Sequence, residues 1–436
     1  MLWQPELPAK YLEMTEDELG AAITARRREL GSKLLILGHH YQQDEVVRHA
    51  DLVGDSLKLS QMAAVEAPKR GARFIVFCGV HFMAETADVL TEESVQVILP
   101  DLSAGCSMAD MAAYDETVQA WEEIHEALAA AKGPKQRVIP ITYVNSTAAI
   151  KAFVGEHGGA CCTSSNAHLV FDWALAGGDE PKKPGKPRGE KIKILFLPDQ
   201  HLGRNTAKAK GFVTEVDVAE GRAKGPAETA LWNPKKDFGG LDHATIRDAK
   251  VLLWAGHCSV HKLFRPEHVL QARAEGCTVL VHPECAQQVV DLADLRGSTE
   301  MIIQTIRSAP AGSRWAVGTE VHLVQRLANE AKERGVVVRM LSDCQCLCTT
   351  MYRIDQQHLL WCLDHLAAGK VVNEIKVHPK ARVQARAALD RMLANVAAPA
   401  PVNEAGPQGV ATKVKHARAD AKPVAGRSSR PALPLD

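Results

Sequence analysis

Three loops of this 436-residue chain each carry a cysteine in a distinctive setting. They hold Cys106 in LSAGC, Cys258 in AGHC and Cys348 in CQCLC. Three thiolates are too few for a closed structural zinc site, which usually takes four ligands. They suit a [4Fe–4S] cluster with one iron free of protein ligands, because ordinary clusters are held by four cysteines. An open iron can act as a Lewis acid on a substrate hydroxyl or carboxylate, so the cysteines predict dehydration rather than electron transfer.

A pair of polar residues spaced by two precedes each of these cysteines. The pairs are His39 and Tyr41, Tyr143 and Asn145, and His282 and Glu284. The separation between His39 and Cys106 is 67 residues, and that between His282 and Cys348 is 66. Residues i and i+2 of a loop at a strand end can point to one side, so each pair can face a shared cavity. Carboxyl, phenol and imidazole groups there could serve as general acids or bases.

A hydroxyl residue follows each pair at an apparent helix start. These residues are Ser56 in GDSLKL, Ser164 in CTSSNA and Thr299 in GSTEM. Backbone N–H groups at a helix start are unpaired and the helix dipole is positive there, which favours carboxylate or phosphate. Each hydroxyl taken alone is better explained as a plain N-cap, since Ser and Thr are preferred caps. Their recurrence beside the cysteine loops favours anion binding, and it implies a substrate or product with several anionic groups.

The elements that must position these loops are short runs of β-branched and leucine residues. Examples are KLLILGHHYQ, RVIPITYVNS and CTVLVHPEC, and each run leads through a polar loop into a helical pattern. Strands that alternate with helices indicate a parallel sheet with helices on both faces. Ligands of such sheets bind at the carboxyl ends of the strands, where the loops lie. The repetition predicts an α/β protein of three similar three-layer αβα domains around a pseudo-threefold axis.

The domain organisation follows from the repeat and from shifts in composition. We expect an N-terminal helical segment at 1–32, α/β domains at 33–132, 133–272 and 273–396, and a disordered tail at 397–436. The second domain should carry two surface insertions, because 178–191 is rich in Pro, Lys and Gly, and 207–242 is polar, Gly-rich and weakly periodic. Thr15 and Glu18 form a capping-box pattern that predicts a helix to about Leu30.

Composition narrows the class of protein. The chain has 52 Lys and Arg against 52 Asp and Glu, so its formal net charge is zero and nucleic acid is a poor partner. No apolar run reaches the about 18 residues of a membrane span, and the N-terminus lacks the pattern of a secretory signal. Eleven cysteines without an export signal point to metal binding or catalysis in a reducing compartment, and hence to a cytoplasmic protein.

Several blocks of the sequence together resemble the quinolinate synthase family of NAD biosynthesis. They are ILGHHYQ…GDSL (36–57), FCGVHFMAETA (77–87), PDLSAGCSMA (100–109), YVNSTAAIKA, CTSSNA, WAGHCSVHKLF (254–264), HPEC, GTE and the CxxM that begins at Cys348. The resemblance runs from about residue 33 to 395, and the blocks are jointly highly specific. The segment RGSTEM departs from it, because the family's block around that threonine is richer in glycine.

The resemblance implies three α/β domains and an oxygen-sensitive [4Fe–4S] cluster held by three cysteines. It also implies the condensation of iminoaspartate with dihydroxyacetone phosphate to quinolinate, with loss of phosphate and two waters. Carried over residue by residue, the cluster ligands are Cys106, Cys258 and Cys348, which leaves Cys344 and Cys346 outside the ligand set. The matching substrate-site positions are His39, Tyr41, Ser56, Tyr143, Asn145, Ser164, His261, His282, Glu284 and Thr299.

Catalytic roles can be expected for four residues, and two alternative functions remain to be weighed. Glu284 and Tyr143 are the expected proton-transfer residues, with Tyr41 and His282 as further catalytic candidates. A transient contact with L-aspartate oxidase, as the producer of iminoaspartate, stays open. One rival function is a [4Fe–4S] hydro-lyase of the aconitase type, which would act on a hydroxy acid without phosphate. Another is a cluster-based oxygen or iron sensor, but the neutral charge and the missing DNA-binding motif disfavour a transcriptional sensor.

Overall fold

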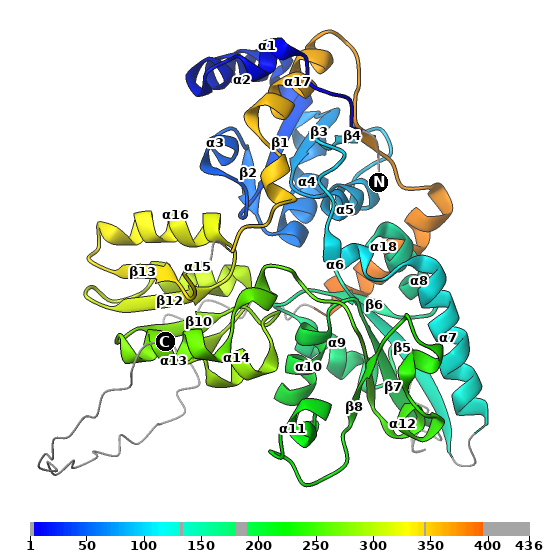
Figure 1. Ribbon diagram of the computed structural model, residues 1–436. Helices are drawn as coiled ribbons and strands as arrows, with labels where there is room; N and C mark the ends of the chain where they lie inside the picture. Colours follow the sequence, from blue (N-terminus) through cyan, green and yellow to red (C-terminus); the bar gives the residue numbers. More distant parts are fainter. Residues whose placement is uncertain (1–3, 131–133, 180–189, 344–345, 396–436) are drawn as a thin grey trace, which may run out of the picture. The chain divides into compact units, whose positions relative to one another are not determined.

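The computed structural model describes residues 4–130, 134–179, 190–343 and 346–395, which form three β-sheets flanked by helices (Figure 1). The strand orders are β14-β4-β3-β1-β2, β6-β5-β7-β9-β8 and β11-β10-β12-β13. Neighbouring strands within these sheets are parallel, except that β14 is antiparallel to β4. The prediction of an α/β protein built on three mostly parallel sheets is therefore confirmed.

The first sheet is formed early in the chain and is completed by a late strand. Its strands are β1 (Leu34–His39), β2 (Leu52–Gly54), β3 (Phe74–Cys78), β4 (Gln96–Ile98) and β14 (Glu374–Ile375). The helices of this part are α1 (Ala9–Leu12), α2 (Glu16–Leu30), α3 (Asp44–Val47), α4 (Ser56–Arg70), α5 (His81–Leu90), α6 (Ser107–Asp110) and α7 (Tyr114–Ala129). Every residue of β1 is buried, as expected for a central parallel strand covered on both faces.

The second sheet has the longest strands. They are β5 (Lys135–Tyr143), β6 (Ala160–Cys162), β7 (Glu190–Leu197), β8 (Thr229–Trp232) and β9 (Val251–Trp254). The helices between them are α8 (Ala148–Glu156), α9 (Ala167–Leu175), α10 (Gln200–Ala209), α11 (Glu215–Ala219) and α12 (His243–Asp248). Leu195, Phe196 and Leu197 of β7 are fully buried, so this strand lies in the core between the two helical layers.

The third sheet is the smallest. Its strands are β10 (Thr278–Val281), β11 (Leu295–Arg296), β12 (Arg314–Gly318) and β13 (Val337–Met340). The later helices are α13 (Pro266–Ala274), α14 (Gln287–Leu292), α15 (Thr299–Arg307), α16 (Val321–Lys332), α17 (Gln356–Ala367) and α18 (Pro379–Ala394). Of these, α17 and α18 leave the third sheet: α17 packs against α2, and α18 packs against α8 and β6.

The packing of α18 on α8 requires a glycine. A Cβ atom at Gly155 would lie 1.9 Å from the carbonyl oxygen of Gln384, so any larger residue would push the two helices apart. At the other end, the predicted capping box is present at α2: the Thr15 hydroxyl accepts from Glu18 N–H, and the Glu18 carboxylate accepts from Thr15 N–H. The predicted helix to Leu30 is confirmed.

The segment 207–242 differs from the expected surface insertion. It contains α11 and the edge strand β8, which pairs in parallel with β9. Trp232 at the end of β8 is buried, and Gly239 packs so closely on its indole that a Cβ atom there would lie 2.4 Å from the ring. The prediction of a surface loop is wrong for β8, because four residues are too short to show an alternating pattern. Of the insertion at 178–191, residues 180–189 lie outside the described part, as does the predicted tail at 397–436.

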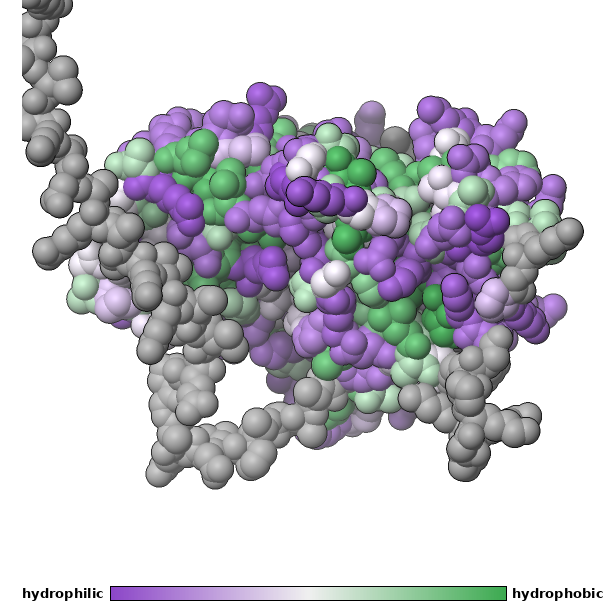
Figure 2. Space-filling view, turned by 90° about the horizontal axis from the view of Figure 1, so that it is seen from below, coloured by the Kyte–Doolittle hydropathy of each residue, from purple (hydrophilic) through white to green (hydrophobic). Residues whose placement is uncertain are grey.

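The face of the molecule in Figure 2 carries both hydrophilic and hydrophobic residues. On this face hydrophobic side chains occur in small groups that hydrophilic side chains separate, as is usual for a surface exposed to water. Within the described ranges, no helix combines the length and the apolar character that a membrane crossing requires.

Candidate functional site

One pocket collects side chains from the strand-end loops of all three sheets. The predicted residues among its lining are His39, Tyr41, Ser56, Cys106, Tyr143, Asn145, Ser164, Cys258, His261, His282, Glu284, Thr299 and Cys348. His39 and Tyr143 are the last residues of β1 and β5, and His282 directly follows β10. The structure thus brings every predicted site residue to one place. Asp55, Thr163 and Thr350 also line the pocket, although the sequence did not predict them.

The three cysteines reach this pocket from three different sheets. Cys106 follows β4, Cys258 follows β9 and Cys348 follows β13. Burial raises the pKa of the Cys106 thiol to about 12, and a charge on Cys348 adds to this rise. Burial, followed by Glu284, raises the pKa of Cys258 well above its usual range. Thiols that oppose one another's ionisation in one cavity suit a cationic metal centre, which would stabilise all three thiolates.

The neighbouring cysteine of the CQCLC run is placed differently. Cys346 is buried in the core of the third sheet, where its sulfur lies 3.5 Å from the Ser342 hydroxyl, and it does not line the pocket. Cys344 lies outside the described residues. Among the described cysteines of this run, Cys348 is therefore the one that faces the site.

The three hydroxyls do not act as the caps of their helices. Ser56 and Thr299 are the first residues of α4 and α15, but the capping side chains are those of Asp55 and Ser298. The plain N-cap explanation is therefore wrong for Ser56 and Thr299, whose side chains line the pocket instead. Ser164 lies in a turn that precedes α9, so the expectation of a helix start is wrong there, although it lines the pocket too.

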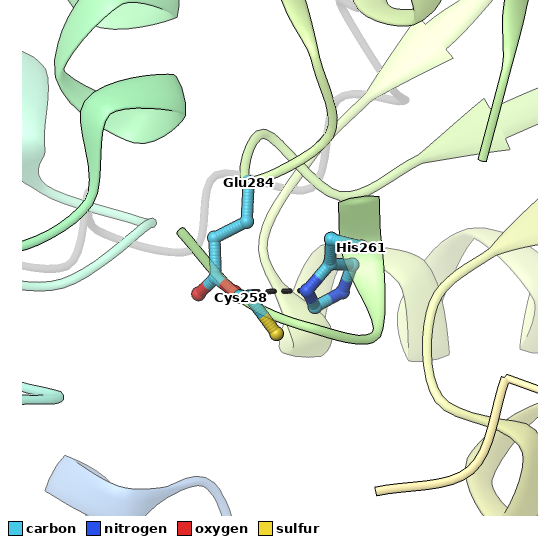
Figure 3. A group of neighbouring side chains, drawn as sticks. All are labelled: Cys258, His261 and Glu284. Atoms are coloured by element: carbon cyan, nitrogen blue, oxygen red, sulfur yellow. Dashed lines mark ion pairs between the residues drawn. The ribbon is translucent and has the colours of Figure 1, made fainter. Parts of the chain in front are cut away.

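Glu284 is a buried carboxylate that contacts His261 (Figure 3). Its carboxylate lies 2.8 Å from Nδ1 of His261 and 3.9 Å from Nδ1 of His282, and both imidazoles are buried. The two rings stack with centroids 4.7 Å apart. Ligand atoms of Cys258, His261 and Glu284 all lie within 4.8 Å of one another, so sulfur, nitrogen and oxygen donors converge here.

The electrostatics favour an ionised Glu284. Burial opposes its ionisation, but the adjacent His261 and a hydrogen bond from Tyr143 hold its pKa below the usual range. Burial and the nearby Glu284 charge raise the pKa of Tyr143 well above its usual range, so its hydroxyl keeps its proton. A carboxylate and a protonated phenol thus lie together in one buried site, which is an arrangement suited to proton transfer.

A matching local geometry recurs in the first and third sheets. The Nδ1 atom of His39 accepts from the backbone N–H of Tyr41 at 3.1 Å, and Nδ1 of His282 accepts from Glu284 N–H at 3.4 Å. Burial lowers the pKa of both histidines to about 3, so both rings are neutral. An accepting Nδ1 on a neutral ring places the proton on Nε2, which makes each ring a donor toward a ligand.

Thr319 links two sides of the pocket, and sequence reasoning missed it. Its hydroxyl lies 2.9 Å from the Tyr41 hydroxyl and 3.2 Å from Nε2 of His261. The Tyr41 hydroxyl also lies 3.0 Å from that of Thr299. A chain of hydrogen bonds therefore runs from Thr299 through Tyr41 and Thr319 to His261. The only sequence signal was the GTE block, which points to the loop but assigns no role to its threonine.

Known proteins resemble this chain over most of its length. The family model described as Quinolinate synthetase A protein matches residues 21–394. The quinolinate synthase of Acidobacterium capsulatum is 51% identical over 88% of this chain and 94% of its own. That of Herpetosiphon aurantiacus is 50% identical over 88% and 94%, and that of Corynebacterium glutamicum is 48% identical over 92% and 93%.

Proposed function

Because the chain belongs to the quinolinate synthase family of NAD-biosynthesis enzymes, we propose that its pocket condenses iminoaspartate with dihydroxyacetone phosphate to quinolinate. The reaction would release phosphate and two waters and would form a carbon–carbon and a carbon–nitrogen bond. The observation that carries this proposal is the pocket itself. It combines three cysteines, several hydroxyl and imidazole donors, and a buried Glu284–His261 pair.

Cys106, Cys258 and Cys348 would hold a [4Fe–4S] cluster. The donor set supports this, since three thiols from three sheets face one cavity and their charges would repel without a cation. When bound, the cluster would supply a Lewis-acidic iron without a protein ligand. Asn145, Glu284 and the histidines supply the remaining polar groups of the cavity, so the protein contributes both binding and proton transfer there.

The neutral donors of the pocket would bind the anionic groups of the substrates. Ser56 and Thr299 lie in the first turns of α4 and α15, where backbone N–H groups and the helix dipole favour carboxylate and phosphate. Ser164 and Asn145 add hydroxyl and amide donors. The Nε2–H of His39 is a further donor, because its Nδ1 is occupied by the Tyr41 amide.

We assign the proton transfers to Glu284 and Tyr143. Glu284 would remove protons during tautomerisation and dehydration, because its pairing with His261 keeps it ionised at neutral pH. Tyr143 would return a proton to a leaving oxygen and would be reprotonated through Glu284. Tyr41 and His282 would orient substrate: the former is tied to Thr299 and Thr319, and the latter stacks on His261.

We place the reaction in the cytoplasm, since the described cysteines are free thiols, as a reducing compartment maintains them. The substrates would be small molecules, with no nucleic acid or membrane partner. L-Aspartate oxidase would meet the protein only transiently, to supply iminoaspartate.

An anaerobic assay of the reconstituted protein tests this proposal. Freshly generated iminoaspartate and dihydroxyacetone phosphate are supplied, quinolinate is detected by mass, and the cluster absorbance is recorded in the same sample. We expect quinolinate only in samples that contain the cluster. An intact cluster without quinolinate would contradict the proposal and favour a hydro-lyase acting on a hydroxy acid.

A further inference from the structure

Lys151 is a fully buried lysine that the proposed reaction does not use. It lies on α8, and its ammonium group donates to the carbonyl of Ser146. It also lies 5.3 Å from the centroid of the Phe82 ring. No carboxylate among the described residues comes within ion-pair distance of it. A buried ammonium whose contacts are a carbonyl and an aromatic ring has no ion-pair partner, so its charge is only weakly compensated.

The surroundings of Lys151 point toward the cysteine site. Phe82, which the ammonium faces, lines the same pocket as Cys106. Burial lowers the pKa of Lys151, whereas negative charge on Cys161, Glu85 or Cys106 would raise it. Cys161 does not supply that charge, since burial raises the pKa of its thiol to about 12 and keeps it neutral. The Glu85 carboxylate, which accepts from the backbone N–H of Ala148 at 2.8 Å, acts on Lys151 only from beyond ion-pair distance.

We propose that Lys151 is the buried counter-charge for the cluster held by Cys106, Cys258 and Cys348. This inference rests on the proposed cluster. Three thiolates outweigh the positive charge of an oxidised [4Fe–4S] core, so the loaded site carries net negative charge next to Phe82. A positive charge behind that ring would stabilise the site and favour its reduction, because net charge is one of the factors that set cluster potentials. Lys151 would thus act through its field and without contact to substrate.

The chain offers a matched control in Lys193. This lysine is also buried, also donates to backbone carbonyls, those of Arg247 and Ala249, and also lies outside ion-pair distance of any described carboxylate. It belongs to β7 near the amino end of the second sheet, whereas the pocket lies at the carboxyl ends. Replacement of either lysine by methionine removes one buried charge of similar size, but only Lys151 lies beside the site.

The experiment measures the midpoint reduction potential of the cluster by EPR-monitored redox titration of three reconstituted proteins: the natural chain, Lys151→Met and Lys193→Met. Cluster content is first confirmed by absorbance. We expect Lys151→Met to shift the potential to more negative values, by at least a tenfold change in the reduced-to-oxidised ratio, which is about 59 mV for one electron. Lys193→Met should leave the potential unchanged. An equal potential in all three loaded proteins would overturn the inference.

A second measurement tests the inference even if the Lys151→Met variant does not take up the cluster. The free energy of unfolding of the cluster-free proteins is compared by urea denaturation. If Lys151 serves the cluster, cluster-free Lys151→Met is at least as stable as the natural chain, because a weakly compensated buried charge has been removed. A less stable cluster-free variant would show that the ammonium serves the fold and would overturn the inference. A natural chain that takes up no cluster would instead contradict the proposed function.

Discussion

Two sides of the pocket are built by equivalent loops but carry different chemistry. On the charged side, His282 and Glu284 follow β10, and the buried Glu284 carboxylate lies 2.8 Å from Nδ1 of His261. On the hydroxyl side, His39 ends β1 and Tyr41 follows two residues later, and the Tyr41 hydroxyl lies within hydrogen-bond distance of the neutral Thr299 and Thr319. Both histidines accept the backbone N–H two residues ahead. The same backbone arrangement thus presents a carboxylate in one sheet and a phenol in the other, so the side chain and its partners decide the role.

The difference has an energetic side. A neutral hydrogen bond contributes only about 0.5–1.5 kcal/mol net, so the hydroxyl side can be altered at moderate cost. A hydrogen bond to a charged group contributes more, about 1.5–3 kcal/mol, because a buried charge left without its partner is costly. We therefore expect substitutions on the charged side to affect turnover much more strongly than those on the hydroxyl side.

The largest effect should follow from removing a cluster ligand, which abolishes the function of both sides together. We expect Cys348→Ala to lose the cluster and all turnover, because its thiol lines the pocket. The matched control is Cys346→Ala, whose thiol packs in the third-sheet core and should leave cluster content unchanged. Iron and sulfide analysis with the visible absorbance of anaerobic samples reads out the result, and a reversed pattern would reassign the ligand.

Glu284→Gln should give the next largest effect and isolate the charged side. The amide keeps the shape but cannot accept a proton, so turnover should fall by about 10²–10⁴-fold while the cluster remains. Glu320→Gln serves as control, since Glu320 is also buried, lies 2.9 Å from Nδ1 of the partly exposed His322 and does not line the pocket. Steady-state kcat with cluster absorbance is the measurement. Near-normal turnover of Glu284→Gln would remove this carboxylate from the mechanism.

Tyr41→Phe should have a smaller effect, on the hydroxyl side. It leaves the Thr299 and Thr319 hydroxyls without a shared partner, and we expect kcat/KM to fall about tenfold, or about 1.4 kcal/mol, mainly through KM. The test is a substrate titration of the loaded enzyme. A loss as large as that of Glu284→Gln would mean that the two sides share the proton transfer and would break the distinction.

The smallest expected effect is a coupling between the two sides through Thr319. Thr319→Val removes the hydroxyl that lies between Tyr41 and His261, and a few-fold loss of kcat/KM is expected. Since Tyr41 and Thr319 share this hydrogen bond, the double variant Tyr41→Phe/Thr319→Val should lose less than the sum of the single changes in free energy. Strict additivity would show that the bond between the two hydroxyls has no part in catalysis.

Much of the site could be predicted because parallel sheets gather their strand-end loops at one edge. The recurring pairs that begin at His39 and His282 therefore predict a shared cavity from the sequence alone. Thr319 could not be predicted, because its contact with Tyr41 joins two sheets whose relative placement no local pattern encodes. The N-cap explanation of Ser56 and Thr299 was wrong for a local reason. The true capping residues, Asp55 and Ser298, precede these hydroxyl residues by one position, and a shift of one residue is below the accuracy of helix-boundary assignment.

In the fold, too, features encoded in local sequence could be predicted, whereas contacts between distant segments could not. The alternation of strands and helices predicted three sheets, yet the short strand β14 and the packing of α18 on α8 depend on contacts between distant segments. Gly155 is the residue at which the sequence reflects the close packing of α18 on α8. A single glycine in a helix does not reveal which segment packs against it, however. The proposed domain limits at 33–132, 133–272 and 273–396 stay a prediction.

The central claim is that one pocket holds both the cluster and the substrate. Mössbauer spectroscopy of protein reconstituted with ⁵⁷Fe, without and with quinolinate, tests it most directly. We predict that one of the four irons of the cluster has distinct parameters and that quinolinate changes this iron alone, because it lacks a cysteine ligand and faces the bound product. A cluster with four equivalent irons, or a spectrum that quinolinate leaves unchanged, would contradict the claim.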